Sequence, residues 1–419
     1  MTPFQLAALF LTLVAGVGWI NARFLRLPSG VAMLLAGAAI PAMQPLSSLF
    51  GFDLTGLARQ VDFPGTVMGS MLAFLLFAGA TQVDLAEMRR RRASVWSLAT
   101  LGVLVSTALV GGGLWLSARV LRIDLPLPWA LAFGALISPT DPIAVLATVK
   151  DDGLSATLRT VLQGEALFND GVGIVVFTAL ASLLTGGPAP NLWTTAALVV
   201  IQAAGGLALG LAGGWLTIRL MRAVDDYAVE VTLTLALAAG VYALAQALHV
   251  SGPIAAVAAG LLVGDTAAAS AMSATTRRYV GGFWTLVDEV LNALLFLLLG
   301  LQLLVVQFLG RHVELWIAAI GLVLLARLLV VAPWGAFFAL ERGERGATRV
   351  LVWGGLHGAL SLALALTLPP GPARGLILSV TYAVVVFSLV AQGLTFPLLI
   401  KRITPRQPNV VTPESAERL

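Results

Sequence analysis

Long apolar runs alternate with short polar segments along nearly the whole chain. Each run contains about 20 residues, the length that an α-helix needs to cross about 30 Å of hydrocarbon. Alternating segments of about ten residues, as in membrane β-barrels, do not occur. The pattern predicts an all-α polytopic membrane protein with about thirteen transmembrane helices. The expected spans are 4–21, 29–44, 65–84, 94–119, 128–149, 158–185, 193–218, 227–248, 252–268, 283–308, 312–339, 348–368 and 374–400.

Composition supports this interpretation. The 419 residues are 58% hydrophobic and 11% charged, whereas a soluble domain carries about 25% charged residues. The chain has no cysteine, which excludes a disulfide or a thiolate metal site, and its net charge of +4 argues against nucleic acid as a partner. The first apolar run lacks the flanks of a signal peptide, so we expect a retained first span.

Basic residues predict the orientation. Most of the 25 lysines and arginines lie in the loops after odd-numbered spans or in the tail, for example Arg89 to Arg92. Cytoplasmic loops carry an excess of such residues, so we expect the N-terminus outside and the C-terminus in the cytoplasm.

Thirteen spans can be divided into two inverted six-helix repeats around one linker helix, an arrangement common among secondary transporters. The polar, interrupted span 128–149 and the glycine-rich span 348–368 then occupy equivalent places. The expected organisation is a transmembrane domain over 1–402, with repeats near 1–185 and 227–402, a linker helix at 193–218, and a cytoplasmic tail over 403–419.

Four charged residues lie deep within predicted spans: Asp141, Glu165, Asp170 and Arg327. Each costs about 2.5–3.5 kcal/mol on insertion scales, and such residues usually face a cavity or a partner. They are therefore the first candidates for a functional site.

Asp141 lies in Ser138-Pro-Thr-Asp-Pro142, where two prolines bracket Thr140. Proline removes a backbone donor and clashes with the preceding turn, so the helix should break and free carbonyl oxygens. Irregular backbone at this depth is tolerated only where it lines a cavity or is buried in protein. We expect an ion site here; a simple proline kink with Asp141 as a helix cap is the alternative.

Glu165 and Asn169 share one face of the next span, and Asp170 lies about 100° further round. Arg327 cannot deprotonate and needs a buried carboxylate, for which Glu165 is the first choice. The structural alternatives are hydrogen-bond anchors between helices for the acids and a snorkelling side chain for Arg327. His357, beside Gly354 and Gly355 in span 348–368, is equally compatible with a structural and a functional role.

Several motifs closely resemble the electroneutral branch of the monovalent cation:proton antiporters, the sodium/proton exchanger family. They occur in family order over nearly the whole chain. The motifs are Ser-Pro-Thr-Asp-Pro-Ile-Ala-Val at 138–145, Gly-Glu-Ala-Leu-Phe-Asn-Asp-Gly-Val-Gly-Ile at 164–174, the segment 283–296, Ala326-Arg327, and Trp-Gly-Gly-Leu-His-Gly-Ala-Leu-Ser-Leu-Ala at 353–363.

The resemblance implies a thirteen-helix, inverted-repeat fold with discontinuous crossing helices, in a homodimer of the bacterial inner membrane. It implies that Asp170 binds either Na⁺ or a proton, with Thr140 and freed carbonyls as co-ligands. The candidate cation- and proton-binding set is Asp170, Thr140, Asp141, Asn169 and Glu165. The resemblance further implies a structural Glu165–Arg327 ion pair, one-for-one exchange marked by Asn169 before Asp170, no cofactor and no enzymatic reaction.

Two positions depart from many relatives: Ala166 replaces serine, and His357 replaces arginine and is a candidate for pH tuning. Other functions remain open. They are K⁺/H⁺ or Li⁺/H⁺ exchange, a cation channel, a metabolite carrier, and an intramembrane protease with Asp141 and Asp170 as its dyad.

Overall fold

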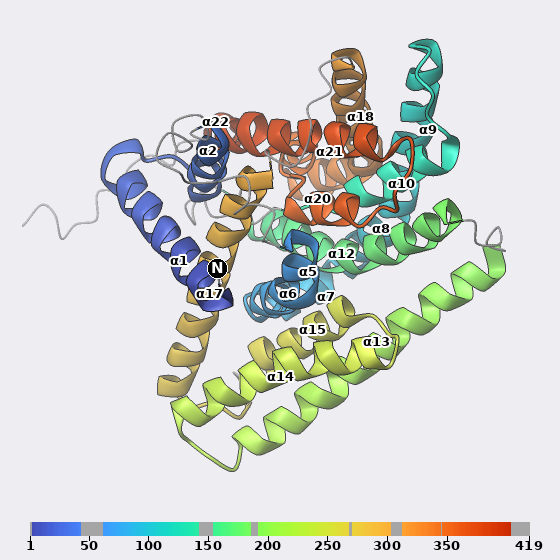
Figure 1. Ribbon diagram of the computed structural model, residues 1–419. Helices are drawn as coiled ribbons and strands as arrows, with labels where there is room; N and C mark the ends of the chain where they lie inside the picture. The colour runs from blue at the N-terminus through green and yellow to red at the C-terminus, as the bar shows by residue number, and fades with distance from the viewer. Residues whose placement is uncertain are drawn as a thin grey trace, which may run out of the picture.

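The computed structural model describes residues 2–42, 62–141, 154–185, 192–267, 270–302, 312–344 and 346–403. Within these ranges the chain is almost entirely helical and contains no β-strand (Figure 1). Nine of the described helices are long and apolar enough to cross a membrane, and three shorter apolar helices accompany them. The predicted all-α polytopic fold is confirmed.

Each predicted span overlaps a described helix or a run of helical pieces, although the second half of span 128–149 lies outside the described residues. Several spans contain π-helical turns, labelled η. The elements are α1 (Pro3–Ile20), η1 (Asn21–Leu25), α2 (Ser29–Ala42), α5 (Phe63–Thr66), η2 (Val67–Met71), α6 (Leu72–Thr81), α7 (Leu85–Arg90), α8 (Arg92–Ser97), η3 (Leu98–Gly102), α9 (Val103–Val120), α10 (Leu127–Ile137), α12 (Ala156–Leu184), α13 (Leu192–Met221), α14 (Tyr227–Ala247), α15 (Gly252–Leu261), η4 (Leu262–Ala267), α17 (Ala274–Leu301), α18 (Val313–Arg342), α19 (Ala347–Trp353), α20 (Ala359–Leu366), α21 (Arg374–Phe387), η6 (Ser388–Gln392) and α22 (Gly393–Ile403).

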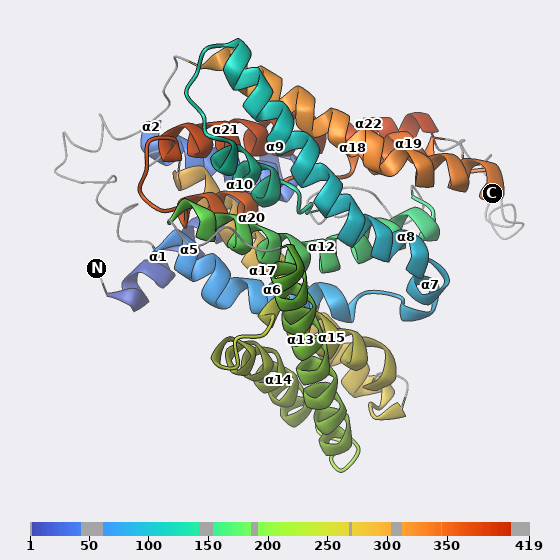
Figure 2. The ribbon, with the colours of Figure 1, turned by 90° about the vertical axis from the view of Figure 1, so that its right-hand side faces the viewer.

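Helices α13, α14 and α15 lie together at one side of the molecule (Figures 1 and 2). The face of α13 that meets α15 carries Gly206, Gly210 and Gly214. A Cβ on Gly206 would collide with the backbone of the residue that caps α15, and a Cβ on Gly210 would collide with the backbone of α15 itself. These glycines therefore serve close helix packing. The division into two six-helix repeats stays a prediction.

The junction between α14 and α15 is very short. His249 adopts the left-handed conformation, with φ of 55°, which ends α14, and the Ser251 hydroxyl accepts the backbone N–H of Ile254 to cap α15. The residues between the two predicted spans thus make a tight turn rather than one continuous helix.

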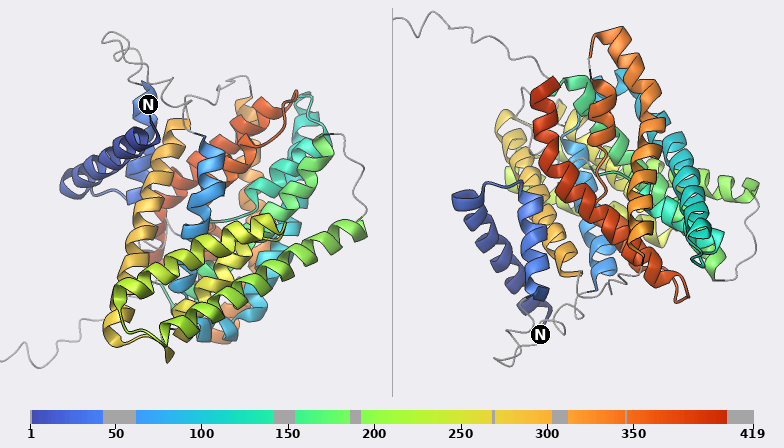
Figure 3. Two further views of the ribbon diagram at one scale, coloured as in Figure 1. Left: turned by 60° about the horizontal axis from the view of Figure 1, so that its bottom comes forward. Right: turned by 90° about the horizontal axis from the view of Figure 1, so that it is seen from above.

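Helix α1 lies at the edge of the molecule (Figure 3), and only 11% of its most apolar window is buried. Large apolar side chains on it, such as Phe4 and Trp19, are exposed. In a membrane protein this is the expected surface toward lipid.

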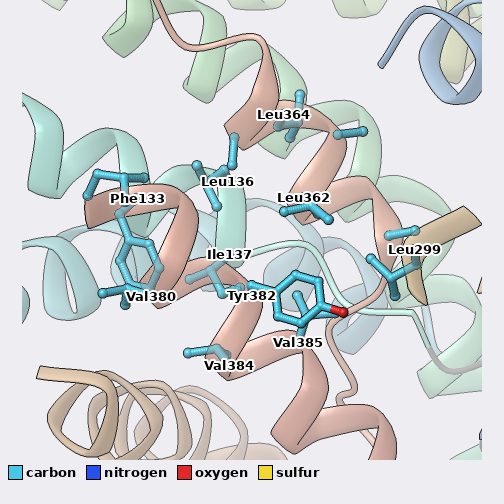
Figure 4. Packing of buried hydrophobic residues seen from close by; sticks show 14 of the residues in the cluster. Phe133, Leu136, Ile137, Leu299, Leu362, Leu364, Val380, Tyr382, Val384 and Val385 are labelled. Atoms are coloured by element: carbon cyan, nitrogen blue, oxygen red, sulfur yellow. The ribbon is translucent and has the colours of Figure 1, made fainter. Parts of the chain in front are cut away.

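Two short helices, α10 and α20, lie in the interior. Phe133 and Ile137 of α10, Leu362 of α20, and Val380 and Tyr382 of α21 form one buried apolar cluster (Figure 4). Because α10 and α20 are too short to span the membrane by themselves, burial among longer helices keeps their ends away from lipid.

Two helical spans are interrupted in the interior. Helix α10 ends at Ile137, and Ser138 to Asp141 are non-helical. Pro139 has no backbone N–H with which to continue the helix. Between α19 and α20, Gly355 to Gly358 are likewise unwound. The helix end predicted at the prolines of span 128–149 is present, and the second half of that span lies outside the described residues; the break in the glycine-rich span 348–368 was not predicted from its residues.

Candidate cation site

The two unwound segments cross and satisfy each other's backbone. The backbone N–H of Asp141 donates to the carbonyl oxygen of Leu356 at 2.7 Å. The Nδ1 atom of His357 lies 3.2 Å from the carbonyl oxygen of Pro139. Buried backbone groups need partners, and here each break supplies them to the other.

This crossing depends on a glycine beside the carboxylate. A Cβ on Gly358 would lie 2.8 Å from Oδ2 of Asp141, closer than normal van der Waals contact. Because Gly358 has no side chain, the start of α20 can approach Asp141 directly.

Helix α12 brings the second acidic motif to the same place. The Asn169 side-chain Nδ2 donates to Oγ1 of Thr140 at 2.9 Å, and both residues are buried. The close approach of α12 to the broken segment is possible at Gly173, where a Cβ would collide with Pro139. Asn169 thereby links the α12 motif directly to the unwound segment after α10.

Thr140, Asp141 and Asp170 line one cavity of about 890 Å³, together with Gly358 and Ser361. Asp170 is half-buried, and the negative charge of Asp141 acts on it. The structure therefore brings the three predicted oxygen-bearing residues together around shared space, and residue 170 faces a cavity that it shares with residues 140 and 141.

Asn169 leaves an unsatisfied oxygen at this site. The residue is 1% exposed, and its Oδ1 has no hydrogen-bond partner. An unpaired buried acceptor costs about 1–3 kcal/mol, and such groups in native structures often mark a position filled by an ion or water. The orphaned oxygen next to Thr140 is therefore consistent with a ligand at the crossing.

Ala166 also lines the cavity, one helical turn before Asp170. The methyl group at this position cannot ligate an ion, so the oxygen donors must come from elsewhere. Among the described residues, no group of three or more His, Cys, Asp or Glu side chains could hold a metal ion.

Glu165 and Arg327 form a buried pair next to the site. Nη1 of Arg327 donates to one carboxylate oxygen of Glu165, and Nη2 donates to the other at 2.9 Å. Nε of Arg327 donates to the carbonyl oxygen of Leu351 at 3.1 Å. Arg327 is 7% exposed and Glu165 2%, so Arg327 does not reach the membrane surface. The pair joins α12 to α18 and to the end of α19.

The cavity contains polar residues that the sequence analysis did not single out. Asp288 and Asn292 of α17 and Gln82 at the end of α6 line it, as does Glu289. The expected span began at 283, which put Asp288 near a membrane surface, whereas α17 begins at Ala274 and Asp288 lies midway along it. The missed signal was the four-residue spacing of Asp288 and Asn292, which places them on one helix face.

A membrane protein that is helical throughout its described residues, and whose two unwound segments meet beside half-buried aspartates, belongs to the class of secondary ion transporters with discontinuous helices. The family model described as "Sodium/hydrogen exchanger, transmembrane" matches residues 9–402. The chain therefore belongs to the sodium/hydrogen exchanger family, and the family resemblance predicted from its motifs is confirmed.

Similar proteins align with this chain over nearly its full length. The chain is 44% identical to the Na(+)/H(+) antiporter NhaP of Pseudomonas aeruginosa, an alignment that covers 96% of this chain and 98% of that one. It is 33% identical to the Na(+)/H(+) antiporter NhaH of Halobacillus aidingensis, with 91% and 93% covered. The solved structure of the sodium proton antiporter MjNhaP1 from Methanocaldococcus jannaschii superposes with a TM-score of 0.73 over 94% of this chain and 97% of that one, at 20% identity, which supports the same fold.

Proposed function

We propose that this protein is a secondary antiporter that exchanges Na⁺ for H⁺, one for one, by competition of the two ions for Asp170. The observation that carries the proposal is the shared cavity of Asp170, Thr140 and Asp141, beside an orphaned amide oxygen of Asn169. The names of its relatives, Na(+)/H(+) antiporters over nearly their whole length, support the same activity.

The chemistry follows from desolvation. Burial penalises a charged carboxylate, so Asp170 is stable at the crossing only when a proton or a cation neutralises it. Thr140 Oγ1, the Asn169 amide oxygen and freed backbone carbonyls supply the oxygen ligands that replace water around Na⁺. If the charged, empty site cannot cross the membrane barrier, only loaded states move, and the two ions are coupled without a further device.

Glu165 belongs in our proposal to the ion pair and not to the cation ligands, because Arg327 occupies both of its oxygens. Asn169, in place of a second carboxylate, leaves one titrating acid on α12 and supports one-for-one exchange. Asp141 contributes negative charge to the same cavity.

The cavity is lined by Arg26, Gln82 and Arg159, which lie at or near the helix ends that adjoin the odd-numbered loops. With the expected orientation, it opens to the cytoplasm. We propose an inner-membrane protein with the N-terminus outside, a homodimer in its membrane, that uses no cofactor and catalyses no covalent reaction.

The test is proton flux in proteoliposomes with Na⁺, Li⁺ or K⁺ supplied in turn. We expect Na⁺-dependent flux by the native protein and none by Asp170→Asn, which keeps the shape of the side chain but cannot carry charge. Asp265→Asn, outside the cavity, is the matched control and should exchange normally. Exchange at the native rate by Asp170→Asn would reject the mechanism, and flux without cation coupling would favour a channel.

A further inference from the structure

The polar face of α17 forms a second group of oxygens in the cavity. Asp288 and Asn292 lie one helical turn apart, and both line the cavity that Asp170 and Asp141 also line. A carboxylate in the middle of a membrane helix is costly unless it serves a cavity or a partner, and neither residue is needed for the ion site at the crossing.

The orientation of the Asn292 amide is determined by its partners. Nδ2 of Asn292 donates to the backbone carbonyl oxygen of Asp288 at 2.9 Å and to its Oδ1 at 3.0 Å. The reversed amide would place an oxygen against two acceptors, so the two partners require this orientation. Oδ1 of Asn292 is then left without a hydrogen-bond partner, although the residue is only 7% exposed.

Exposure decreases along this face of α17. Thr285 is exposed, Asp288 is half-buried and Asn292 is buried. The face therefore leads from the cavity mouth into the protein, and the carboxylate comes before the orphaned amide oxygen on that route.

Charge favours a cation here. The negative charge of Asp141 acts on Asp288 as it does on Asp170. Glu289 adds a further acid to the cavity lining, and the Gln82 amide is a further polar group there. Arg26 and Arg159 also line the cavity and oppose this charge in part. An amide oxygen coordinates cations but does not take up protons at working pH, so Asn292 indicates a cation and not a proton relay.

We propose that Asp288 and Asn292, assisted by Gln82, form a vestibule site that holds the transported monovalent cation before it reaches Asp170. The proposal rests on the proposed exchange function. The vestibule site raises the local cation concentration next to the crossing, since like charges lining a cleft focus the field on ions of opposite sign, and it does not take part in the exchange step at Asp170.

The experiment is Na⁺-dependent proton flux in proteoliposomes as a function of Na⁺ concentration. For Asp288→Asn and Asn292→Ala we expect the apparent KM for Na⁺ to rise about fivefold or more, while the maximal rate stays within about twofold of native, because removal of a pre-binding site weakens capture and not turnover. Asp265→Asn is the matched control and should keep the native KM.

An unchanged KM in both variants, or a fall in maximal rate with the KM unchanged, would overturn the vestibule site. Should Asn292→Ala fail to fold, Asp288→Asn and Gln82→Ala decide by the same criterion. Failure of the proposed exchange function can be distinguished from failure of the vestibule site, because the native protein would then show no Na⁺-dependent flux at all.

A binding measurement separates the two sites directly. In the Asp170→Asn background, equilibrium binding of radioactive Na⁺ should retain a weak component, which the additional change Asp288→Asn should abolish. Identical binding by the Asp170→Asn and the doubly substituted proteins would refute the proposal.

Discussion

The buried pair of Glu165 and Arg327 allows a quantitative prediction. In Glu165→Leu the Arg327 guanidinium keeps only its bond to the carbonyl oxygen of Leu351, in a site where the side chain is 7% exposed. The variant loses two charge-assisted hydrogen bonds and leaves a desolvated positive charge without a counterion.

The expected loss of unfolding free energy is about 3–5 kcal/mol, the cost of removing one partner from a buried ion pair. This agrees with the loss of two hydrogen bonds to charged groups at about 1.5–3 kcal/mol each. Replacing both residues by apolar ones removes the charges together, so Glu165→Leu with Arg327→Leu should cost far less than the sum of the two single changes.

The assay is reversible unfolding in mixed detergent micelles, with the two single variants and the double variant compared. A matched control is Glu314→Leu, a change at an exposed acid in the first turn of α18, which should alter stability by less than about 0.5 kcal/mol. The reasoning is refuted if the single variants lose less than about 1 kcal/mol, or if the double variant loses the full sum of the two.

Three further predictions concern the crossing and the polar loop between α6 and α8. In His357→Arg the charge beside the end of α10 no longer depends on pH, so activity should extend to more alkaline pH than in the native protein; an unchanged pH profile of exchange would contradict this. In Gly358→Ala the new methyl group meets the carboxylate of Asp141 at about 2.8 Å, so exchange should fall at least about tenfold with the protein still folded, as flux and gel-filtration measurements can check. Burial raises the pKa of the Glu87 carboxyl, but hydrogen bonds and positive charge from Arg91 and Arg90 outweigh burial and lower this pKa below the ordinary 4.5. The charged Glu87 therefore stabilises the fold above that pH, and the stabilisation is lost as the pH falls. Glu87→Gln should lower the unfolding free energy at pH 7 but not below about pH 3, which denaturation at both pH values can test.

Much of the membrane architecture could be predicted because lipid imposes strict rules. Apolar length determines where a helix can span, and the short turn at His249 separates two spans as expected. The helix end near Pro139 was predictable because proline limits helix formation locally, whereas the glycines near Gly355 permitted either an irregular backbone or close packing. The partner of Arg327 was predictable since a permanent buried charge needs an acid, and Glu165 was the first choice.

Asp288 and Asn292 were not found in this way. Residues such as Arg277 and Tyr279 before the expected span looked like loop, yet they belong to α17, which begins at Ala274. Helix ends in water are decided by capping, and here the Ser273 hydroxyl accepts the backbone N–H of Thr276, a local signal that hydropathy does not register. The shift moved Asp288 from an apparent membrane surface to the middle of the helix.

The sequence by itself determined that this chain spans a membrane as helices, that the helix before Pro139 ends within the membrane, and which charged residues are too costly there without a cavity or a partner. Only the tertiary structure decided which broken ends meet, that Asn169 binds Thr140, and that α17 lends its polar face to the cavity of Asp170. The reason is physical: insertion cost and helix propensity depend on each residue and its near neighbours, whereas a binding cavity depends on distances between residues far apart in the chain.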